Sequence, residues 1–237
     1  MAEILLWIPC GSARPESWLQ VVGYMQTKIP EGYSLDFRLT PPGDTMRTWN
    51  QLTRDFLDSK AEWLWSVHDD VVYNPLTLER LLSWNEPLIS ALIFMKQNPA
   101  MPHVWKIQNG KHAQMVDETL EWMLDHKNNI LPGPQVWNPK PEDALTSVSF
   151  TSTSCMLMHR SVIEDTAKYG DWWQNDVMYE AGGEDRRFCK HAREEGYTPY
   201  VDRSCIAGHL GINPSGVMDF VMWHMNPLFT QTCEDMI

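Results

Sequence analysis

The chain has 237 residues, of which 43% are hydrophobic, and its formal net charge is −12. This length is typical of one or two domains, and the apolar share supplies a substantial core, which excludes a wholly disordered chain. The acidic balance argues against sequence-independent binding of polyanions, because such binding requires basic surface, but it leaves room for a local basic groove.

The first 94 residues alternate between short apolar runs and helical periodicities. The run ILLWIPC at 4–10 is typical of a buried strand, and alternating apolar residues at 33–39 predict a half-buried one. The expected elements are strands at 4–10, 33–39, 63–67 and 88–94 and helices at 15–29, 44–57 and 75–82. This order predicts an α/β fold with a mostly parallel central sheet flanked by helices.

Periodicity fails between residues 95 and 146, a segment rich in Pro, Asn, His and Trp that predicts one helix near 117–126. Long irregular segments of this kind are usually functional loops or linkers, and the many aromatic residues of this one disfavour a linker. The elements expected beyond it are a strand at 148–158, a helix from Arg160, a helix at 184–195, a strand at 198–201 and an amphipathic segment at 217–229.

The chain has no apolar run of the roughly 18 residues that a membrane span requires, and its N-terminus lacks the layout of a secretory signal. Its five cysteines are widely spaced without a Cys-x-x-Cys pair, which favours reduced thiols over a disulfide framework or a thiolate zinc site. We therefore expect a cytoplasmic protein.

A pair of acids, Asp69 and Asp70, follows the predicted strand at 63–67. Ligands of open parallel sheets bind beyond the carboxyl ends of the strands. Adjacent carboxylates repel each other unless a cation or a sugar hydroxyl compensates them, and hard divalent cations prefer oxygen ligands. The alternative that this motif leaves open is a solvated turn with an Asx cap.

Two further features stand later in the chain. In the run from Gly182 to Asp185, two glycines precede Glu184 and Asp185 in the first turn of a predicted helix. These acids either stabilise the helix N-terminus or supply a general base for an acceptor hydroxyl, which the helix dipole is expected to keep ionised. His209 comes after a predicted strand and is flanked by Gly208 and Gly211. Its imidazole either reaches a ligand or is structural.

In this order, the three features resemble glycosyltransferases of the GT-A fold, near family 2. The strand that ends at Pro9 and the run TSTSCMLMHRSVIED add to the resemblance, which covers roughly residues 3–211. It implies a single glycosyltransferase domain over residues 1–237, with a nucleotide-sugar-binding half at 1–94 and an acceptor-side half at 95–237.

The resemblance implies a site for Mn²⁺ or Mg²⁺. Asp70 matches the last acid of the family's Asp-x-Asp motif, which holds the cation, and Asp69 matches its middle position. His68 stands where the family usually has its first acid, and imidazole is also a ligand for Mn²⁺. His209 matches the family's late metal-binding histidine.

The resemblance also implies a catalytic base and a donor site. Asp185 matches the base of inverting members, with Glu184 beside it. The residues implied to contact the nucleotide sugar are Pro9, Cys10, Gly11, Arg47, Asn50, Asp69 and Asp70. Trp172, Trp173 and Gly183 are expected to line the sugar or acceptor pocket, although packing beneath the helix explains the two tryptophans equally well.

The function expected from these matches is metal-dependent transfer of a sugar from a nucleoside-diphosphate sugar to an acceptor hydroxyl, with inversion if Asp185 is the base. The acceptor stays open among polysaccharide, protein, small molecules and modified bases of viral DNA, so nucleic acid enters only as an acceptor. Two rivals are a non-catalytic nucleotide-sugar-binding module and a metal-dependent phosphohydrolase. The hydrolase is disfavoured because the chain lacks the dispersed His and Asp motifs of two-metal sites.

Overall fold

The computed structural model describes residues 1–8, 25–39, 45–96, 100–126, 135–136, 140–174 and 183–209. Nine described strands form one large sheet: β1 (Ala2–Ile8), β2 (Tyr33–Leu39), β3 (Trp63–Val67), β4 (Val71–Val72), β5 (Leu88–Ile93), β8 (Gln135–Val136), β9 (Leu145–Ser147), β11 (Cys155–His159) and β12 (Tyr200–His209). A smaller antiparallel sheet contains β10 (Phe150–Thr151), β6 (Val104–Gln108) and β7 (Lys111–Gln114). The described helices are α2 (Thr45–Asp58), α3 (Thr77–Leu82), α4 (Val116–Asp125), α5 (Arg160–Thr166) and α6 (Gly183–Glu194), with 3₁₀ turns at Glu142–Ala144 and Ala167–Tyr169.

The large sheet is mixed, in the order β2-β1-β3-β11-β5-β12-β4, with β8 and β9 also paired to β12. β1 lies parallel to β2 and β3, β5 lies parallel to β12, and β11 runs antiparallel to both β3 and β5. Five long strands therefore point the same way, and β11 is reversed among them. The expectation of a mostly parallel sheet holds for those five strands, whereas the short strands and β11 make the whole sheet mixed.

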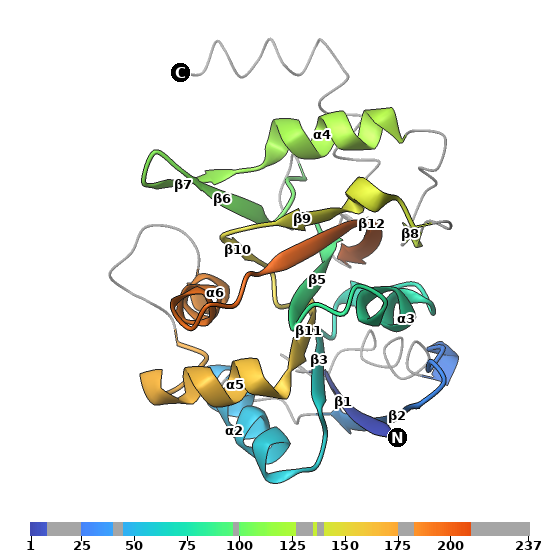
Figure 1. Ribbon diagram of the computed structural model, residues 1–237, viewed down its shortest axis with the longest axis vertical. Helices are drawn as coiled ribbons and strands as arrows, with labels where there is room; N and C mark the ends of the chain where they lie inside the picture. Colours follow the sequence, from blue (N-terminus) through green and yellow to red (C-terminus); the bar gives the residue numbers. More distant parts are fainter. Residues whose placement is uncertain are drawn as a thin grey trace.

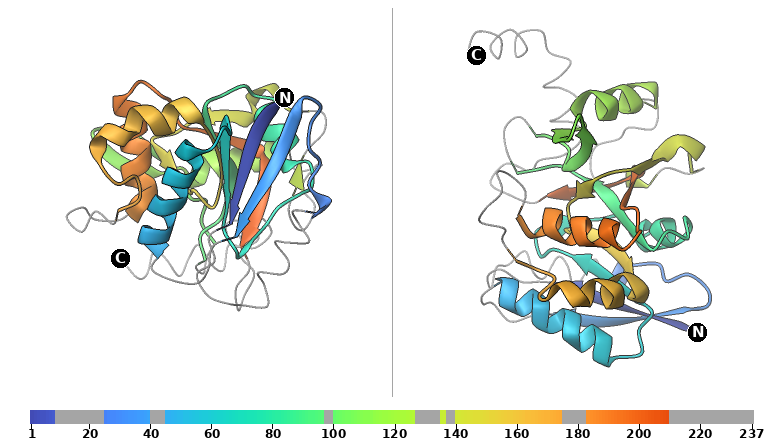
Figure 2. Two further views of the ribbon diagram at one scale, coloured as in Figure 1. Left: turned by 90° about the horizontal axis from the view of Figure 1, so that it is seen from below. Right: turned by 60° about the vertical axis from the view of Figure 1, so that its left-hand side comes forward.

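Helices cover both faces of this sheet (Figures 1 and 2). Alternate residues of β1 point to opposite faces, so Ile4 and Leu6 join the core beneath α3 while Leu5 and Trp7 join the core beneath α2, α5 and α6. All four side chains are nearly or fully buried. A third apolar cluster lies between α4 and the strands β5, β6 and β12.

The segment at 95–146 is more regular than its sequence predicts. It contains the hairpin of β6 and β7, whose two-residue turn is Asn109-Gly110, with φ of 51° and 75°. Asn-Gly is the preferred sequence for such a turn, because both residues adopt positive φ there. The helix expected near 117–126 is present as α4.

The strand expected at 148–158 is two strands. The buried residues Ser152, Thr153 and Ser154 form a connection between β10 and β11, and this TST connection interrupts the apolar run. Cys155 then pairs with Val67, the last residue of β3, so the chain enters the large sheet from the carboxyl edge and β11 must run backwards. A direct connection of this kind needs no crossover helix, which a parallel strand would require.

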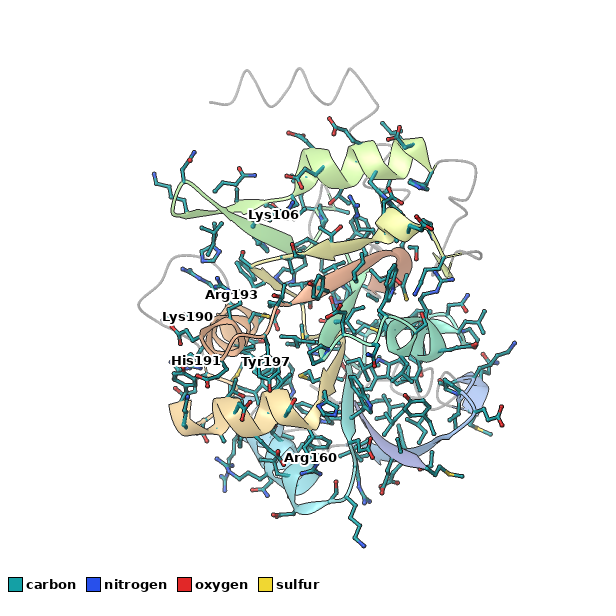
Figure 3. The ribbon with its side chains drawn as sticks, viewed as in Figure 1. Lys106, Arg160, Lys190, His191, Arg193 and Tyr197 are labelled. Atoms are coloured by element: carbon teal, nitrogen blue, oxygen red, sulfur yellow. The ribbon has the colours of Figure 1, made fainter. Side chains whose placement is uncertain are left out.

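The C-terminal end of α2 is held by Arg160, the first residue of α5 (Figure 3). Its guanidinium donates hydrogen bonds of 2.8 to 3.1 Å to the main-chain carbonyls of Phe56, Leu57, Ser59 and Ala61. Helix C-termini leave carbonyls without helical partners, and this side chain satisfies several of them at once.

The three described cysteines, Cys155, Cys189 and Cys205, are free and buried, as expected for reduced thiols. Burial raises the pKa of Cys155 and of Cys189 to about 12. None of the described helices combines the length and the apolar character that crossing a membrane requires.

Candidate functional site

The candidate site lies at the carboxyl edge of the large sheet. His68, Asp69 and Asp70 follow β3, Lys96 follows β5, and His209 is the last residue of β12. Because β3, β5 and β12 point the same way, their ends meet at one edge. The acid pair therefore stands where ligands of open α/β sheets bind. The structure leaves Asp69 half-buried.

Asp70 and His209, which are far apart in sequence, face each other across this edge. The Asp70 Oδ1 atom lies 4.0 Å from the Nε2 atom of His209, and Oδ1 is buried without a hydrogen-bond partner. The His209 Nδ1 atom lies 2.6 Å from the carbonyl oxygen of Phe94. A carbonyl only accepts, so Nδ1 carries the proton. Burial lowers the pKa of His209, which favours the neutral imidazole, and with the proton on Nδ1 the lone pair is on Nε2, 4.0 Å from Asp70 Oδ1.

The other oxygen of Asp70 already has a cation. The ammonium of Lys96 forms an ion pair with Asp70 Oδ2. Burial opposes ionisation of Asp70, but the hydrogen bond and the positive charge of Lys96 favour it, and the pKa of Asp70 is lowered. The carboxylate is therefore charged at neutral pH.

His68 is held from behind by the TST connection. Its main-chain N donates to the carbonyl of Ser154 at 3.0 Å, and its Nδ1 lies 3.1 Å from the Ser154 hydroxyl. Its ring packs against Trp49, with centroids 4.8 Å apart. Burial lowers the pKa of His68 to about 3, so the ring is neutral, and its Nε2 is buried without a hydrogen-bond partner.

These atoms fit a divalent cation only in part. Asp70 Oδ1 and His209 Nε2 offer one oxygen and one nitrogen, a donor set that suits Mn²⁺. However, no group of three or more His, Cys, Asp or Glu side chains is placed to hold a metal ion within the described ranges. Divalent ions in phosphate-transfer sites often take only one or two protein ligands and complete their shell with substrate phosphates and water. The residues present fit that arrangement, with the ammonium of Lys96 as a competing cation.

A second cluster surrounds Asp185 in the first turn of α6. Its Oδ1 atom accepts two hydrogen bonds from Thr153, one from the main-chain N at 3.1 Å and one from the hydroxyl at 2.5 Å. Its Oδ2 atom lies 3.9 Å from the Nε2 atom of His103, a residue of the connection between β5 and β6. Glu184 stands beside it and is partly buried.

The pKa of Asp185 is higher than its place at a helix N-terminus predicts. Burial raises it to about 6, against the two hydrogen bonds from Thr153, and at pH 7 the carboxylate is still mostly ionised. Burial and the neighbouring Asp185 charge raise the pKa of Glu184 as well. Burial lowers the pKa of His103 to about 4, so this ring is neutral. A carboxyl group that titrates near neutrality has the pKa that suits a general base.

The two clusters are close enough to form one site. The TST connection contacts both, because Thr153 bonds Asp185 while Ser154 bonds His68. His103 also lies within electrostatic range of both sides, of His68 and His209 in one cluster and of Glu184 in the other.

The residues expected to bind the nucleotide are only partly described. Pro9, Cys10 and Gly11 lie outside the described residues. Arg47 borders an open hollow of about 420 Å³ between α2 and the segment after α5, whose lining residues are Met46, Arg47, Asn50, Arg54, Asp171, Trp173 and Gln174. The exposed Arg47 side chain is thus placed where an anion can approach it.

Asn50 has a structural task that the sequence expectation did not include. Its amide nitrogen donates to the carbonyls of Trp173 and Met46, at 2.8 and 2.9 Å, and its amide oxygen accepts from the main-chain N of Trp173 at 3.1 Å. These bonds join α2 to a segment 123 positions away. With both ends of its amide engaged and only 4% exposed, Asn50 connects α2 to the segment of Trp173, and the nucleotide contact expected of it stays a prediction.

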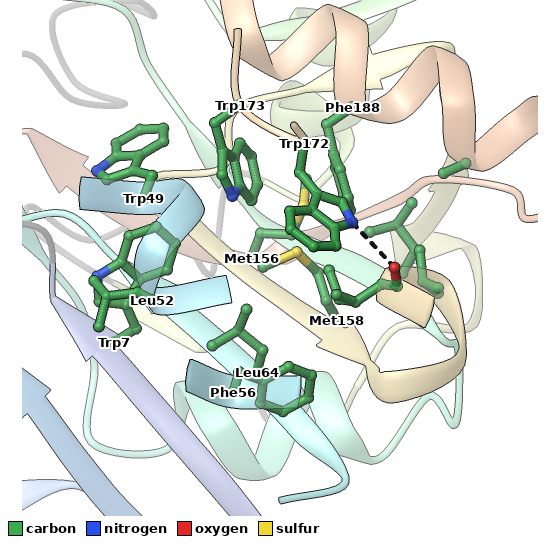
Figure 4. Packing of buried hydrophobic residues seen from close by; sticks show 14 of the residues in the cluster. Trp7, Trp49, Leu52, Phe56, Leu64, Met156, Met158, Trp172, Trp173 and Phe188 are labelled. Carbon is green, nitrogen blue, oxygen red and sulfur yellow. Dashed lines mark hydrogen bonds between the residues drawn. The ribbon is translucent and has the colours of Figure 1, made fainter. Parts of the chain in front are cut away.

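The two tryptophans expected to line a sugar or acceptor pocket lie in the core (Figure 4). Trp172 is 7% exposed and donates to the carbonyl of Ile163 at 3.0 Å, while Trp173 is 1% exposed and donates to the Thr53 hydroxyl at 2.7 Å. Trp173 also stacks on Phe188 of α6, with centroids 4.8 Å apart. The packing alternative therefore describes both indoles, because their N–H groups find partners inside the core. Gly183, the first residue of α6, is exposed.

Sequence reasoning did not single out Lys96, His103, Thr153 or Ser154. Lys96 had a usable signal, since it stands two residues beyond the predicted strand at 88–94 and the carboxyl ends of parallel strands carry ligands. Thr153 and Ser154 belong to a run of four small hydroxyl residues within an apolar segment, which indicates buried hydrogen-bonding groups. His103 had no such signal.

Comparisons with known proteins add little to this geometry. No family model matches the chain, and no curated protein matches it. The crystal structure of A197 from STIV is similar with a TM-score of 0.49 and 13% sequence identity, over 89% of this chain and 86% of that chain. A likeness at this level carries no argument about function, so the function has to be inferred from the residues of this chain.

Proposed function

We propose that this chain is a GT-A-like glycosyltransferase that moves a sugar from a nucleoside-diphosphate sugar to an acceptor hydroxyl, assisted by Mn²⁺ or Mg²⁺. The observation that carries the proposal is the pairing of two unlike clusters at one sheet edge. One presents Asp70 Oδ1, which has no hydrogen-bond partner, and His209 Nε2 to a cation, and the other presents the half-buried carboxyl group of Asp185, whose pKa is raised to about 6.

Each cluster suits one half of such a reaction. When a sugar leaves a nucleoside diphosphate, negative charge develops on the departing phosphate, and a divalent cation stabilises that charge. Asp70 and His209 would hold this cation, while Lys96 lies close enough to add positive charge. Asp185 would take the proton of the attacking hydroxyl through Oδ2, because Oδ1 is engaged by Thr153. Attack from the face opposite the leaving group inverts the anomeric centre.

A second candidate is a nucleotide-sugar-binding module without catalysis. The ion pair between Lys96 and Asp70 favours it, because an internal cation already neutralises the carboxylate that would hold the metal. In that case the protein binds the donor and does not turn it over.

The deciding experiment incubates the full chain with a panel of nucleotide sugars and Mn²⁺ and measures release of nucleoside diphosphate together with binding. The His209→Ala variant serves as the test of the cation site, and His126→Ala, which alters a half-buried histidine near the end of α4, is its matched control. Donor-dependent release that is lost in His209→Ala and kept in His126→Ala supports the transferase. Binding without release supports the module, and release that His209→Ala leaves unchanged removes the cation site from the mechanism.

A further inference from the structure

The TST connection places three buried hydroxyl groups at the carboxyl edge of the sheet. Ser152, Thr153 and Ser154 are 2%, 0% and 4% exposed. Buried hydroxyls are destabilising unless they are hydrogen-bonded, and all three have partners here. Ser152 Oγ donates to Ser154 Oγ at 2.7 Å and accepts from the Ser154 main-chain N at 3.1 Å, so the two serines brace the turn around Thr153.

Thr153 is directed at a single oxygen of Asp185. Its main-chain N and its hydroxyl both donate to Oδ1, and two donors from one rigid residue fix the rotation of the carboxylate about its Cβ–Cγ bond. The other oxygen, Oδ2, lies 3.9 Å from His103 Nε2, which is beyond hydrogen-bond length. Thr153 therefore distinguishes the two oxygens: Oδ1 is held, and Oδ2 keeps its lone pairs.

We propose that Thr153 is the positioning residue of the Asp185 base, holding Oδ1 so that Oδ2 is presented to the acceptor hydroxyl. This inference rests on the proposed transferase function. The serines are the support of Thr153, and Ser154 links the same turn to His68 of the cation-side cluster. One short connection thus fixes the position of the base relative to the donor side of the site, as transfer of a group between two bound molecules requires.

The contact has a measurable electrostatic consequence. The groups that face Asp185 are Glu184 and Cys189 on its own helix, His103 from the β5–β6 connection and Thr153 from the TST connection. The hydrogen bonds from Thr153 lower the pKa of Asp185, against burial. Removing the hydroxyl while keeping the main-chain N–H should therefore raise the pKa of Asp185 further, by about one unit.

The experiment compares Thr153→Val, which has the shape of threonine without the hydroxyl, with Thr153→Ser, which keeps the hydroxyl. The titration of the Asp185 carboxyl is followed by ¹³C NMR, and the pH profile of sugar transfer is measured on the same samples. Thr166→Val is the matched control, because Thr166 is 2% exposed and its hydroxyl bonds only carbonyls of its own helix, at Val162 and Ile163. If Thr153→Val does not fold, Thr153→Ala replaces it, since alanine also lacks the hydroxyl.

We expect Thr153→Val to move the Asp185 midpoint and the acid limb of the rate profile upward together by about one unit, and to lower kcat about tenfold with little change in donor KM. Thr153→Ser should restore both, and Thr166→Val should move neither. If the wild type transfers sugar but the Asp185 midpoint does not move in Thr153→Val, the positioning role of Thr153 is overturned and the proposed function is not. Absence of transfer by the wild type would instead remove the proposed function, and the base role with it.

Discussion

Replacement of Asp185 by asparagine should make the protein more stable at neutral pH while abolishing its proposed activity. Burial raises the pKa of Asp185 from 3.8 to about 6 in the folded state, so folding favours the protonated form. The free energy of unfolding therefore falls as pH rises from about 4 to about 6, and the loss persists at higher pH. A shift of about two units corresponds to up to about 3 kcal/mol.

Asparagine removes the charge and keeps the geometry. The asparagine side-chain oxygen can accept the two hydrogen bonds from Thr153 that Asp185 Oδ1 accepts in the wild type. Relief of the buried charge should raise Tm at pH 7.5 by up to roughly 10 °C for a chain of this length. Transfer should fall by about a hundredfold or more, because the amide cannot take a proton, while donor binding is kept.

The assay is differential scanning calorimetry of both proteins between pH 4 and pH 8, together with donor affinity and transfer rate. The stability difference should be near zero at pH 4 and complete above pH 7. Asp117→Asn is the matched control, since Asp117 is an exposed acid in the first turn of α4 and should lose about 0.3–1 kcal/mol on substitution. A variant at Asp185 that is also less stable at pH 7.5 would show that the acid merely stabilises the start of α6, and retained transfer would exclude it as the base.

Three further changes test neighbouring contacts. Lys96→Met should tighten Mn²⁺ binding about tenfold in a calorimetric titration, because it removes the ammonium that competes for Asp70; unchanged affinity would mean that the cation does not use this carboxylate. Asn50→Ala should destabilise the fold by about 2–3 kcal/mol in urea unfolding, since the main-chain groups of Trp173 lose their partners. Gln51→Ala, on the exposed side of α2, should destabilise it by under about 0.5 kcal/mol, and equal losses in the two variants would contradict the connecting role of Asn50. Arg160→Lys should lower stability by about 2 kcal/mol, because one ammonium cannot reach the four carbonyls that the guanidinium serves, and a Tm within 1–2 °C of the wild type would be the contrary result.

Local sequence patterns predicted many of the strands and helices. The strands at 33–39 and 63–67 have the bounds that alternation and apolar continuity predict, and the helices α2, α5 and α6 begin within one residue of their expected starts. Such patterns succeed because a strand or an amphipathic helix is specified by side chains only two to four positions apart. The hairpin at 104–114 could also have been predicted, since Asn109-Gly110 is a strong turn signal. It was missed because the segment as a whole is polar and irregular in its pattern.

The reversed strand β11 shows where local patterns fail. Its apolar run is compatible with a single strand at 148–158, and the residues Ser152–Ser154 that divide it are small enough to fit a strand. The direction of β11 is set by where the chain enters the sheet, beside Val67, and not by its own side chains. The same holds for Trp172, whose sequence neighbours fit a pocket and a core equally well.

The sequence by itself determined that acids follow β3 and that acids open α6. It did not place His209 at a strand end, because the strand expected at 198–201 extends to residue 209 as β12. The alternation of strands and helices up to residue 94 predicts a common direction for β3 and β5, but the reversal of β11 shows that this argument does not extend to the later strands. Only the tertiary structure decided the partners of these acids. The pairing of Asp70 with both Lys96 and His209, and the hold of Thr153 on Asp185, join positions 26 to 139 residues apart. The pKa of Asp185 likewise depends on burial beneath distant segments, and burial is a property of the packed fold that neighbours in sequence do not encode.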